Sequence, residues 1–361
     1  MMKRSLWIGI CLCCCLSLAA KSNVSERKVL YPSVDQHGDS IILSGCLSVP
    51  QDKAPKGIIL LPHYTICSND EAPSNKVTAE AGYFNEDFVL VMPDYIGYGV
   101  TGNRVHPYLH GELTARNTVD MLFAVQPILD SMSLGIPLDS IYIVGVSQGG
   151  ATAVWTLKLI EEEFADKIHV IKCFASSGPY DVAATYDEAK RTNFVGLAAT
   201  IAILVTGTDA AYDLHLDYNE LFTRPMQRAY TRYIADKKMG VFPILLRMPS
   251  HKLTHWLKPQ ALDKTNPQAK RLYEGLLRSS LVHYPEDGGA DSVCTTWRPT
   301  TPLYILHSTN DDVVTFRCAE NLQRCLSDSP NITWDFDKYG NHLVSIYHFY
   351  TLVQNMLSEE K

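Results

Sequence analysis

Short continuous runs of hydrophobic residues alternate with segments of helical periodicity along most of this chain. Residues 141–146 hold only hydrophobic residues and Gly, a composition typical of a strand buried on both faces of a parallel sheet. In residues 151–164, Val154, Leu157 and Ile160 recur at helical spacing, so a helix is expected there. The same criteria predict further strands at residues 40–49, 57–61, 88–92, 168–174, 303–307 and 332–336, and further helices at residues 113–129, 318–326 and 343–357. Such alternation favours an α/β fold with a mostly parallel central sheet covered by helices on both faces.

Two segments depart from the simple alternation. Gly38 supplies a turn before residues 40–49, so this strand is expected to form a hairpin with the segment around Val29. Between residues 181 and 292, helical stretches are punctuated by prolines, and no clear buried strand is expected. We interpret this segment as a helical cap or lid inserted into one α/β core, whose two parts are residues 21–180 and 293–361.

Composition narrows the class of protein. The chain has 361 residues, 46% of them hydrophobic and 20% charged, which fits a globular protein with a sizeable core and excludes a disordered or coiled-coil chain. The formal charge is −7, and no segment is expected to gather Lys and Arg into a stripe. We therefore expect a small-molecule partner and no nucleic acid.

The N-terminus has the layout of an export signal. Lys3 and Arg4 precede an apolar run over residues 6–20 that ends in small residues, as in a secretory signal peptide of residues 1–20. The run is too short to span a membrane, and an uncleaved anchor helix is the alternative. We expect a periplasmic or secreted protein, with lipid attachment through one of the cysteines at positions 13–15 as a further possibility.

Four of the ten cysteines lie in this predicted signal, which leaves six in the mature protein: Cys46, Cys67, Cys173, Cys294, Cys318 and Cys325. Six cysteines allow fifteen pairings, and export permits disulfides without requiring them, so the pairing stays open. No spacing of Cys or His indicates a zinc site, and we expect no metal.

A candidate nucleophile stands where a predicted strand gives way to a helix. Residues 145–149 read Gly-Val-Ser-Gln-Gly and match the G-x-S-x-G pattern with Ser147 at its centre. A sharp turn between strand and helix projects such a serine above the sheet, and the flanking glycines avoid collisions with the backbone. Ser147 is therefore the expected nucleophile.

A serine hydroxyl needs a base that is itself oriented by a carboxylate. The loop after the strand at residues 303–307 contains Asp311 and Asp312, and Asp311 is the expected acid with Asp312 as the alternative. His342 follows the last predicted strand and precedes the final helix, so it is the expected base. Two backbone N–H groups should bind the oxyanion, namely those of Gln148 and of Tyr64, which lies in the loop after residues 57–61.

With these residues in place, the sequence resembles the α/β-hydrolases, and more narrowly the secretory lipase group of the yeast lipase A type and its bacterial relatives. The similarity is carried by Pro62-His63-Tyr64-Thr65, Pro93-Asp94-Tyr95-Ile96-Gly97-Tyr98-Gly99, His106-Pro107-Tyr108, the G-x-S-x-G motif, the Asp311 loop and His342. The resemblance implies a carboxylic ester hydrolase with a helical cap inserted after the sixth strand. His63 and Asp94 are candidates for the pocket wall, while Asp94 could instead cap its own turn.

The predicted reaction is acyl transfer from an ester to water through an acyl-enzyme, with no metal or organic cofactor. One alternative keeps the triad and takes a peptide, as in prolyl-type peptidases or aminopeptidases. Acidic cap residues could then hold an amine: Asp209, Asp213, Asp217 and Glu220. A second enzymatic alternative removes acyl groups from a polysaccharide. The non-enzymatic alternative is an exported binding protein. The oligomeric state is not indicated by the sequence.

Overall fold

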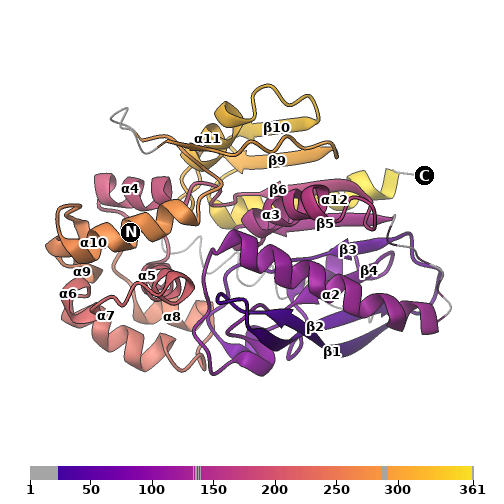
Figure 1. The fold of residues 1–361 in the computed structure, drawn as a ribbon, viewed down its shortest axis with the longest axis horizontal. Helices are drawn as coiled ribbons and strands as arrows, with labels where there is room; N and C mark the ends of the chain where they lie inside the picture. Colours follow the sequence, from indigo (N-terminus) through magenta and orange to yellow (C-terminus); the bar gives the residue numbers. More distant parts are fainter. Residues whose placement is uncertain are drawn as a thin grey trace.

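The computed structural model describes residues 23–132, 134, 136, 138, 140–285 and 292–359. The predicted signal peptide lies outside these residues. The centre of the fold is an eight-stranded sheet with the order β1-β2-β4-β3-β5-β6-β9-β10 (Figure 1). Its strands are β1 Val24–Val34, β2 Ser40–Pro50, β3 Ile58–Leu60, β4 Val89–Pro93, β5 Ile141–Val146, β6 Val170–Ser176, β9 Leu303–Ser308 and β10 Ile332–Asp337.

The strand directions agree with the expected fold. Strand β2 pairs antiparallel with β1, as the predicted hairpin requires, and also antiparallel with β4. All pairings from β4 through β10 are parallel. Every strand predicted from a hydrophobic run is present, so the predicted α/β-hydrolase sheet is confirmed.

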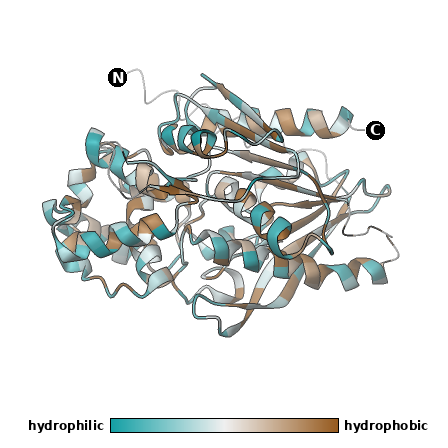
Figure 2. Cartoon of the chain, turned by 45° about the horizontal axis from the view of Figure 1, so that its top comes forward, coloured by the Kyte–Doolittle hydropathy of each residue, from teal (hydrophilic) through white to brown (hydrophobic). Residues whose placement is uncertain are grey.

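The two faces of the sheet bury different residues of the same strand. In β3, Ile58 and Leu60 belong to a core formed with helices α2, α3 and α11. Ile59 between them faces the opposite core, which contains helix α12. This alternation follows from the two-residue period of a strand, and it explains why buried parallel strands are hydrophobic throughout. The covering helices are α2 Gly111–Ser131, α3 Gln148–Glu163, α11 Arg317–Cys325 and α12 His342–Glu359. Figure 2 shows the hydrophobic residues gathered on the central strands.

The segment between β6 and β9 is mostly helical and lies at one end of the sheet (Figure 1). Its helices are α4 Val182–Thr192, α5 Ala198–Tyr212, α6 Tyr218–Leu221, α7 Arg224–Ala229, the π-helix η4 Tyr230–Ile234, α8 Val241–Arg247, α9 Leu253–Trp256, η5 Pro259–Leu262 and α10 Pro267–Arg278. They enclose a hydrophobic core of their own, centred on α5. The insertion after the sixth strand is thus present, and its division from the core stays our interpretation of this order.

One expectation for this segment is wrong. Strand β7, Val282–His283, is buried and pairs with β8, Val293–Cys294, although no buried strand was expected before residue 292. Two residues are too few to produce a hydrophobic period, which is why the sequence pattern misses them. A disulfide joins Cys294 of β8 to Cys325 at the end of α11. Within the described residues, Cys46, Cys67, Cys173 and Cys318 are free and buried.

The buried carboxylate of Asp181 connects the two places where the chain passes between the core and the cap. Asp181 caps α4, where its side chain accepts a hydrogen bond from the Ala184 amide. It also accepts hydrogen bonds from His283 Nδ1 at 2.9 Å and from Asn321 Nδ2 at 2.7 Å. The exit from the core at Asp181 is therefore tied to the return at His283. No helix in the described parts of the chain is long and apolar enough to cross a bilayer.

Candidate active site

Ser147 stands at the sharp turn between β5 and α3. Its backbone has φ 56° and ψ −124°, a conformation that costs a non-Gly residue free energy. Two hydrogen bonds hold it, from the Ser147 amide to Ser176 O and from the Ala151 amide to Ser147 O. A Cβ on Gly145 would lie 2.1 Å from the Gly149 carbonyl oxygen, so the turn requires Gly at this position. The predicted elbow is thus formed.

The expected acid, base and nucleophile meet in one hydrogen-bonded chain. His342, the first residue of α12, places Nε2 3.1 Å from Ser147 Oγ. Its other ring nitrogen, Nδ1, lies 2.7 Å from Asp311 Oδ2. All three residues are buried or nearly so, which strengthens electrostatic interactions between them. The structure therefore brings together Ser147, His342 and Asp311 from three separate loops at the carboxyl ends of the strands.

The Asp311 carboxylate is stabilised in its charged form. Burial by itself would raise its pKa, but His342, His307 and the Val313 amide outweigh that effect and lower the pKa below 3.8. Oδ1 accepts hydrogen bonds from the amides of Val313 and Val314, both at 2.9 Å. The other oxygen, Oδ2, is therefore the one that contacts His342. A carboxylate held in this way can orient an imidazole and stabilise its positive charge.

The neighbouring Asp312 also contacts His342, through the backbone. Asp312 Oδ1 accepts a hydrogen bond from the His342 amide at 3.2 Å. Nearby, Ser308 Oγ donates to the Gly340 carbonyl at 2.5 Å and so ties the acid loop to the loop that carries the base. Of the two adjacent carboxylates, Asp311 contacts the imidazole ring and Asp312 holds the start of its helix.

The loop after β3 lies against the first turn of α3. A Cβ on Gly149 would be 2.1 Å from the Pro62 carbonyl oxygen, so only Gly allows the two segments to approach this closely. Gln148 is the first residue of α3, where backbone N–H groups have no partner within the helix. Tyr64 follows in the same loop, and its carbonyl accepts a hydrogen bond from His63 Nδ1 at 2.6 Å. The two predicted oxyanion donors thus belong to adjoining segments beside Ser147.

His63 and Asp94 are buried and engaged within the protein. Burial lowers the pKa of His63, and its Nε2 lies 3.2 Å from the Asp94 carbonyl oxygen. The Asp94 carboxylate accepts hydrogen bonds from Ser44 Oγ at 2.5 Å and from the Ser74 amide at 2.8 Å. These contacts favour the alternative in which Asp94 fixes the loop after β4, and its place in a pocket wall stays a prediction.

His106 contacts the residue after the nucleophile, a contact that the sequence analysis did not foresee. Its Nδ1 donates to the Ile96 carbonyl at 2.7 Å, and its Nε2 lies 2.7 Å from the Gln148 side-chain amide. Burial, with a smaller effect of the Lys237 charge, lowers the pKa of His106 to about 3. The ring is therefore neutral, and Nε2 can accept a hydrogen bond from Gln148. The His-Pro-Tyr motif was the only signal for this position.

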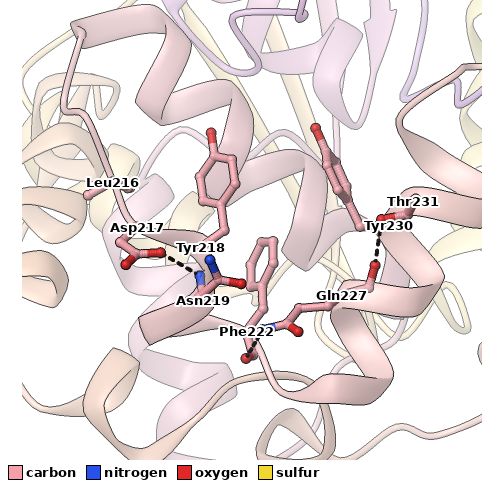
Figure 3. A pocket seen from close by; sticks show the side chains of 8 residues that line it. All are labelled: Leu216, Asp217, Tyr218, Asn219, Phe222, Gln227, Tyr230 and Thr231. Atoms are coloured by element: carbon pink, nitrogen blue, oxygen red, sulfur yellow. Dashed lines mark hydrogen bonds between the residues drawn. The ribbon is translucent and has the colours of Figure 1, made fainter.

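The cap touches the acid loop directly. Gly196, between α4 and α5, would place a Cβ 2.2 Å from the Asp312 carbonyl oxygen. A separate open cavity of about 490 Å³ lies within the cap, where the rings of Tyr218, Phe222 and Tyr230 stand side by side (Figure 3). Its lining comes from residues 216–231 alone. This cavity is therefore distinct from the Ser147 site.

Comparison with protein families identifies the chain. Residues 78–349 match the sequence model of the family described as secretory lipase, and this match covers most of the chain. The chain belongs to the secretory lipase family. The family predicted from the motifs is thus confirmed, and the protein is a carboxylic ester hydrolase. A search of curated proteins finds no significant match.

Solved structures share the fold of this secretory lipase. The rice cell wall degrading esterase LipA from Xanthomonas oryzae superposes with a TM-score of 0.75 at 20% identity, over 96% of this chain and 93% of that one. A protein described as a hydrolase from Legionella pneumophila gives 0.76 at 20%, over 94% and 90%. Lipase A from Candida antarctica, in its closed state, gives 0.64 at 17%, over 89% and 74%. At these identities the likeness concerns the fold.

Proposed function

We propose that this protein hydrolyses carboxylic esters with a Ser147–His342–Asp311 triad. The observation that carries the proposal is the continuous hydrogen-bonded chain, with 3.1 Å from Ser147 Oγ to His342 Nε2 and 2.7 Å from His342 Nδ1 to Asp311 Oδ2. When the imidazole is neutral and Nδ1–H donates to the carboxylate, the Nε2 lone pair can accept the serine proton. This tautomer is the one that general-base catalysis needs.

Each residue then has a defined task. Ser147 Oγ attacks the ester carbonyl carbon while His342 Nε2 takes its proton, which forms a tetrahedral intermediate. His342 returns that proton to the alcohol oxygen, the carbon–oxygen bond breaks, and an acyl-enzyme on Ser147 remains. Water, deprotonated by His342, then attacks the acyl carbonyl and releases the carboxylic acid. Asp311 stabilises the imidazolium in both halves of the reaction.

The N–H groups of Gln148 and Tyr64 are the proposed oxyanion donors. Gln148 opens α3, and the positive end of this helix dipole lies at the same position. Pro62 lies against Gly149, so the Tyr64 loop is close enough to supply a second donor. Removal of one oxyanion donor typically slows such enzymes by about 10²- to 10³-fold. His106, through its contact with the Gln148 side chain, serves as a positioning residue for this hole.

We infer that the protein is exported, and three observations support this. The N-terminal 20 residues have the composition of a signal peptide. The disulfide between Cys294 and Cys325 fits an oxidising compartment. The family to which the chain belongs is itself named for secretion.

The peptidase alternative has less support. An aminopeptidase would need free carboxylates to hold the substrate amine, but Asp209 accepts hydrogen bonds from Tyr218 OH and the Leu216 amide. Asp217 caps α6, and Asp213 lies 3.4 Å from His37. Three of the four acidic cap residues are thus engaged within the chain, the fourth being the exposed Glu220, and an ester substrate is favoured.

The test compares p-nitrophenyl esters of graded acyl length with the matching p-nitroanilides. We expect the wild-type protein to cleave the esters and to leave the anilides nearly intact. Ser147→Ala should lower ester turnover by at least about 10⁴-fold. Ser177→Ala removes a buried hydroxyl that contacts Ser345 instead of His342. This variant is the matched control, and near-normal turnover is expected for it. Equal ester hydrolysis by Ser147→Ala and wild type contradicts the proposal.

A further inference from the structure

One stretch of the cap differs sharply in charge from the rest of the chain. Residues 222–262 contain eight of the chain's 32 basic residues but only one of its 39 acidic residues, Asp236. The protein as a whole carries a formal charge of −7. The expectation that no segment gathers Lys and Arg is therefore wrong for this stretch. Apart from the adjacent pair Lys237 and Lys238, its basic residues stand four or more positions apart along the chain.

Helices α7 and η4 run on from one another and present a row of arginines. Arg224, Arg228 and Arg232 follow at intervals of four residues, a spacing that places side chains on one helix face. All three are exposed. Among the described residues, no carboxylate lies within ion-pairing distance of them. The positive charge of this row is thus available to a partner.

The next helix, α8, exposes large hydrophobic side chains beside this row. Phe242 is 54% exposed and Leu246 is 83% exposed, and their four-residue spacing puts them on one face. The opposite face buries Ile244. Both α8 and η4 pack against α5, and α7 and α8 lie at the same end of the cap (Figure 1). Arg247 of α8 also lies over the ring of Tyr233 in η4, which fixes the two helices as neighbours.

This surface is connected to the acid loop of the active site through a short series of backbone contacts. Directly after α8, Lys252 forms a β-bridge with Phe194, and the His251 carbonyl accepts a hydrogen bond from the Val195 amide. Gly196 follows and contacts the Asp312 carbonyl. Phe194 is itself 43% exposed and stacks on His251. A partner that binds over α8 would therefore lie close to the acid loop.

We propose that the exposed face formed by Arg224, Arg228, Arg232, Phe242 and Leu246 docks on the surface of an anionic lipid aggregate. Basic side chains attract anionic headgroups, and hydrophobic side chains insert between them, so both parts of the face have a function on such a surface. The remaining surface, which is acidic on balance, is repelled by the same headgroups. The charge distribution thus selects one orientation, in which the cap meets the lipid. Leu246 at 83% exposure favours a lipid over a nucleic acid, because a phosphate backbone offers it no apolar contact.

The experiment measures binding of the full-length mature Ser147→Ala protein to sedimented vesicles, since this variant should not consume the lipid. We expect binding to phosphatidylcholine vesicles that contain phosphatidylglycerol, weak binding to phosphatidylcholine alone, and a loss of binding as salt is raised. Phe242→Ser with Leu246→Ser should weaken binding by at least about tenfold. Replacement of Arg224, Arg228 and Arg232 by Gln should remove the preference for phosphatidylglycerol.

Leu30→Ser with Ile42→Ser is the matched control, because these side chains are 59% and 53% exposed on the β1–β2 hairpin and belong to none of the helices α7, η4 and α8. Unchanged vesicle binding is expected for this pair, and thermal unfolding should show that every variant folds. Equal binding to both kinds of vesicle, or equal losses for the two hydrophobic pairs, overturns the proposal. DNA binding that needs the arginines but not Phe242 and Leu246 overturns it as well. The assay does not depend on turnover, so failure of the triad would be seen separately, in ester hydrolysis.

Discussion

At the scale of single residues, the site depends on a strained backbone and on one well-placed carboxylate. Ser147 occupies a conformation that costs roughly 1–3 kcal/mol, and the pairing of its amide with Ser176 O helps to maintain it. Asp311 keeps its charge despite burial because His342, His307 and backbone amides surround it. The two residues thus place a serine hydroxyl and an oriented imidazole within hydrogen-bond distance.

The adjacent carboxylates Asp311 and Asp312 should respond very differently to amide substitution. Asp311→Asn can donate to His342 Nδ1 and favour the wrong tautomer, so kcat for a p-nitrophenyl ester should fall by about 10⁴-fold. Asp312→Asn still offers an oxygen to the His342 amide and should lower kcat by less than about tenfold. Steady-state kinetics of both variants decides the matter, and a larger loss for Asp312→Asn would reverse the assignment.

These residues also mark how far the sequence alone can predict the site. Ser147 and His342 were predictable because each stands at a fixed place between a strand and a helix. Asp311 and Asp312 could not be separated, since both are carboxylates in one loop and only the side-chain direction distinguishes them. The contact of His106 with Gln148 was not predictable, because it joins a loop to the start of a helix 42 residues later and leaves no periodic signal in the sequence.

At the scale of elements, a short helix buries an acidic residue against the last helix of the core. Glu80 lies in the 3-10 helix η2, Ala79–Tyr83, which packs against α12. The side chain is 3% exposed, and Tyr350 of α12 is among the groups its charge acts on. Burial raises the pKa of Glu80 to about 7, because its effect outweighs the lowering effects of the Glu80 amide and the Thr78 side chain. The carboxyl group is therefore protonated in the folded protein at mildly acidic pH.

This pKa makes stability depend on pH in a defined direction. The folded protein binds the Glu80 proton more tightly than the unfolded chain. The stabilisation of the folded state by this protonated carboxyl group is therefore fully present below about pH 4.5 and is lost as pH rises toward about 7. Glu80→Gln should therefore be more stable than wild type above about pH 7, by up to about 3 kcal/mol, and similar to it near pH 4.5. Urea unfolding of both proteins across this range measures the difference. A constant difference at all pH values would contradict the assignment.

The elements themselves were largely predictable, and the exceptions are short. Buried parallel strands such as β5 are continuous hydrophobic runs, and α3 shows a clear helical period, so both could be assigned without the structure. Strand β7 has only two residues, and its pairing with β8 is a non-local contact. The short helices η1, Asn69–Glu71, and η3, Gly99–Thr101, likewise leave no periodic signal.

At the scale of the whole molecule, one lysine of the cap holds a loop of the core. Lys237, after η4, donates hydrogen bonds to the carbonyl oxygens of Gly97 and Arg104, and its Nζ lies 4.9 Å from the ring centroid of Tyr98. Burial lowers the pKa of this lysine to about 8. The loop that it holds continues to His106. Lys237 thus links the position of the cap to the core segment whose His106 contacts Gln148.

Lys237→Met should loosen this link. Two carbonyls would lose their partner, so we expect a loss of about 1–3 kcal/mol in the free energy of unfolding, together with a fall in kcat/KM for a soluble ester. Lys238→Met is the matched control, because the neighbouring side chain is 82% exposed, and a change within about 0.5 kcal/mol is expected. Denaturant unfolding and ester kinetics test both variants. Equal effects of the two substitutions would show that the cap is held elsewhere.

The insertion of the cap was visible in the sequence as an interruption of the alternation, but its attachment to the core was not. The contact of Lys237 with Gly97 spans 140 residues and has no local signature. The same holds for the arginine row of α7 and η4, which becomes a surface only when the helix forms. Long-range contacts of this kind attach the cap to loops beside a site whose residues lie on both sides of the cap in the sequence.

A fluorophosphonate probe with peptide mapping tests whether Ser147 is an activated nucleophile. We expect one phosphonate on the wild-type protein, located on Ser147, and none on Ser147→Ala or His342→Ala. The probe reports activation of the hydroxyl whatever the natural ester is, so the result is independent of the choice of substrate. A label on another residue, or undiminished labelling of Ser147→Ala, would show that Ser147 is not the nucleophile.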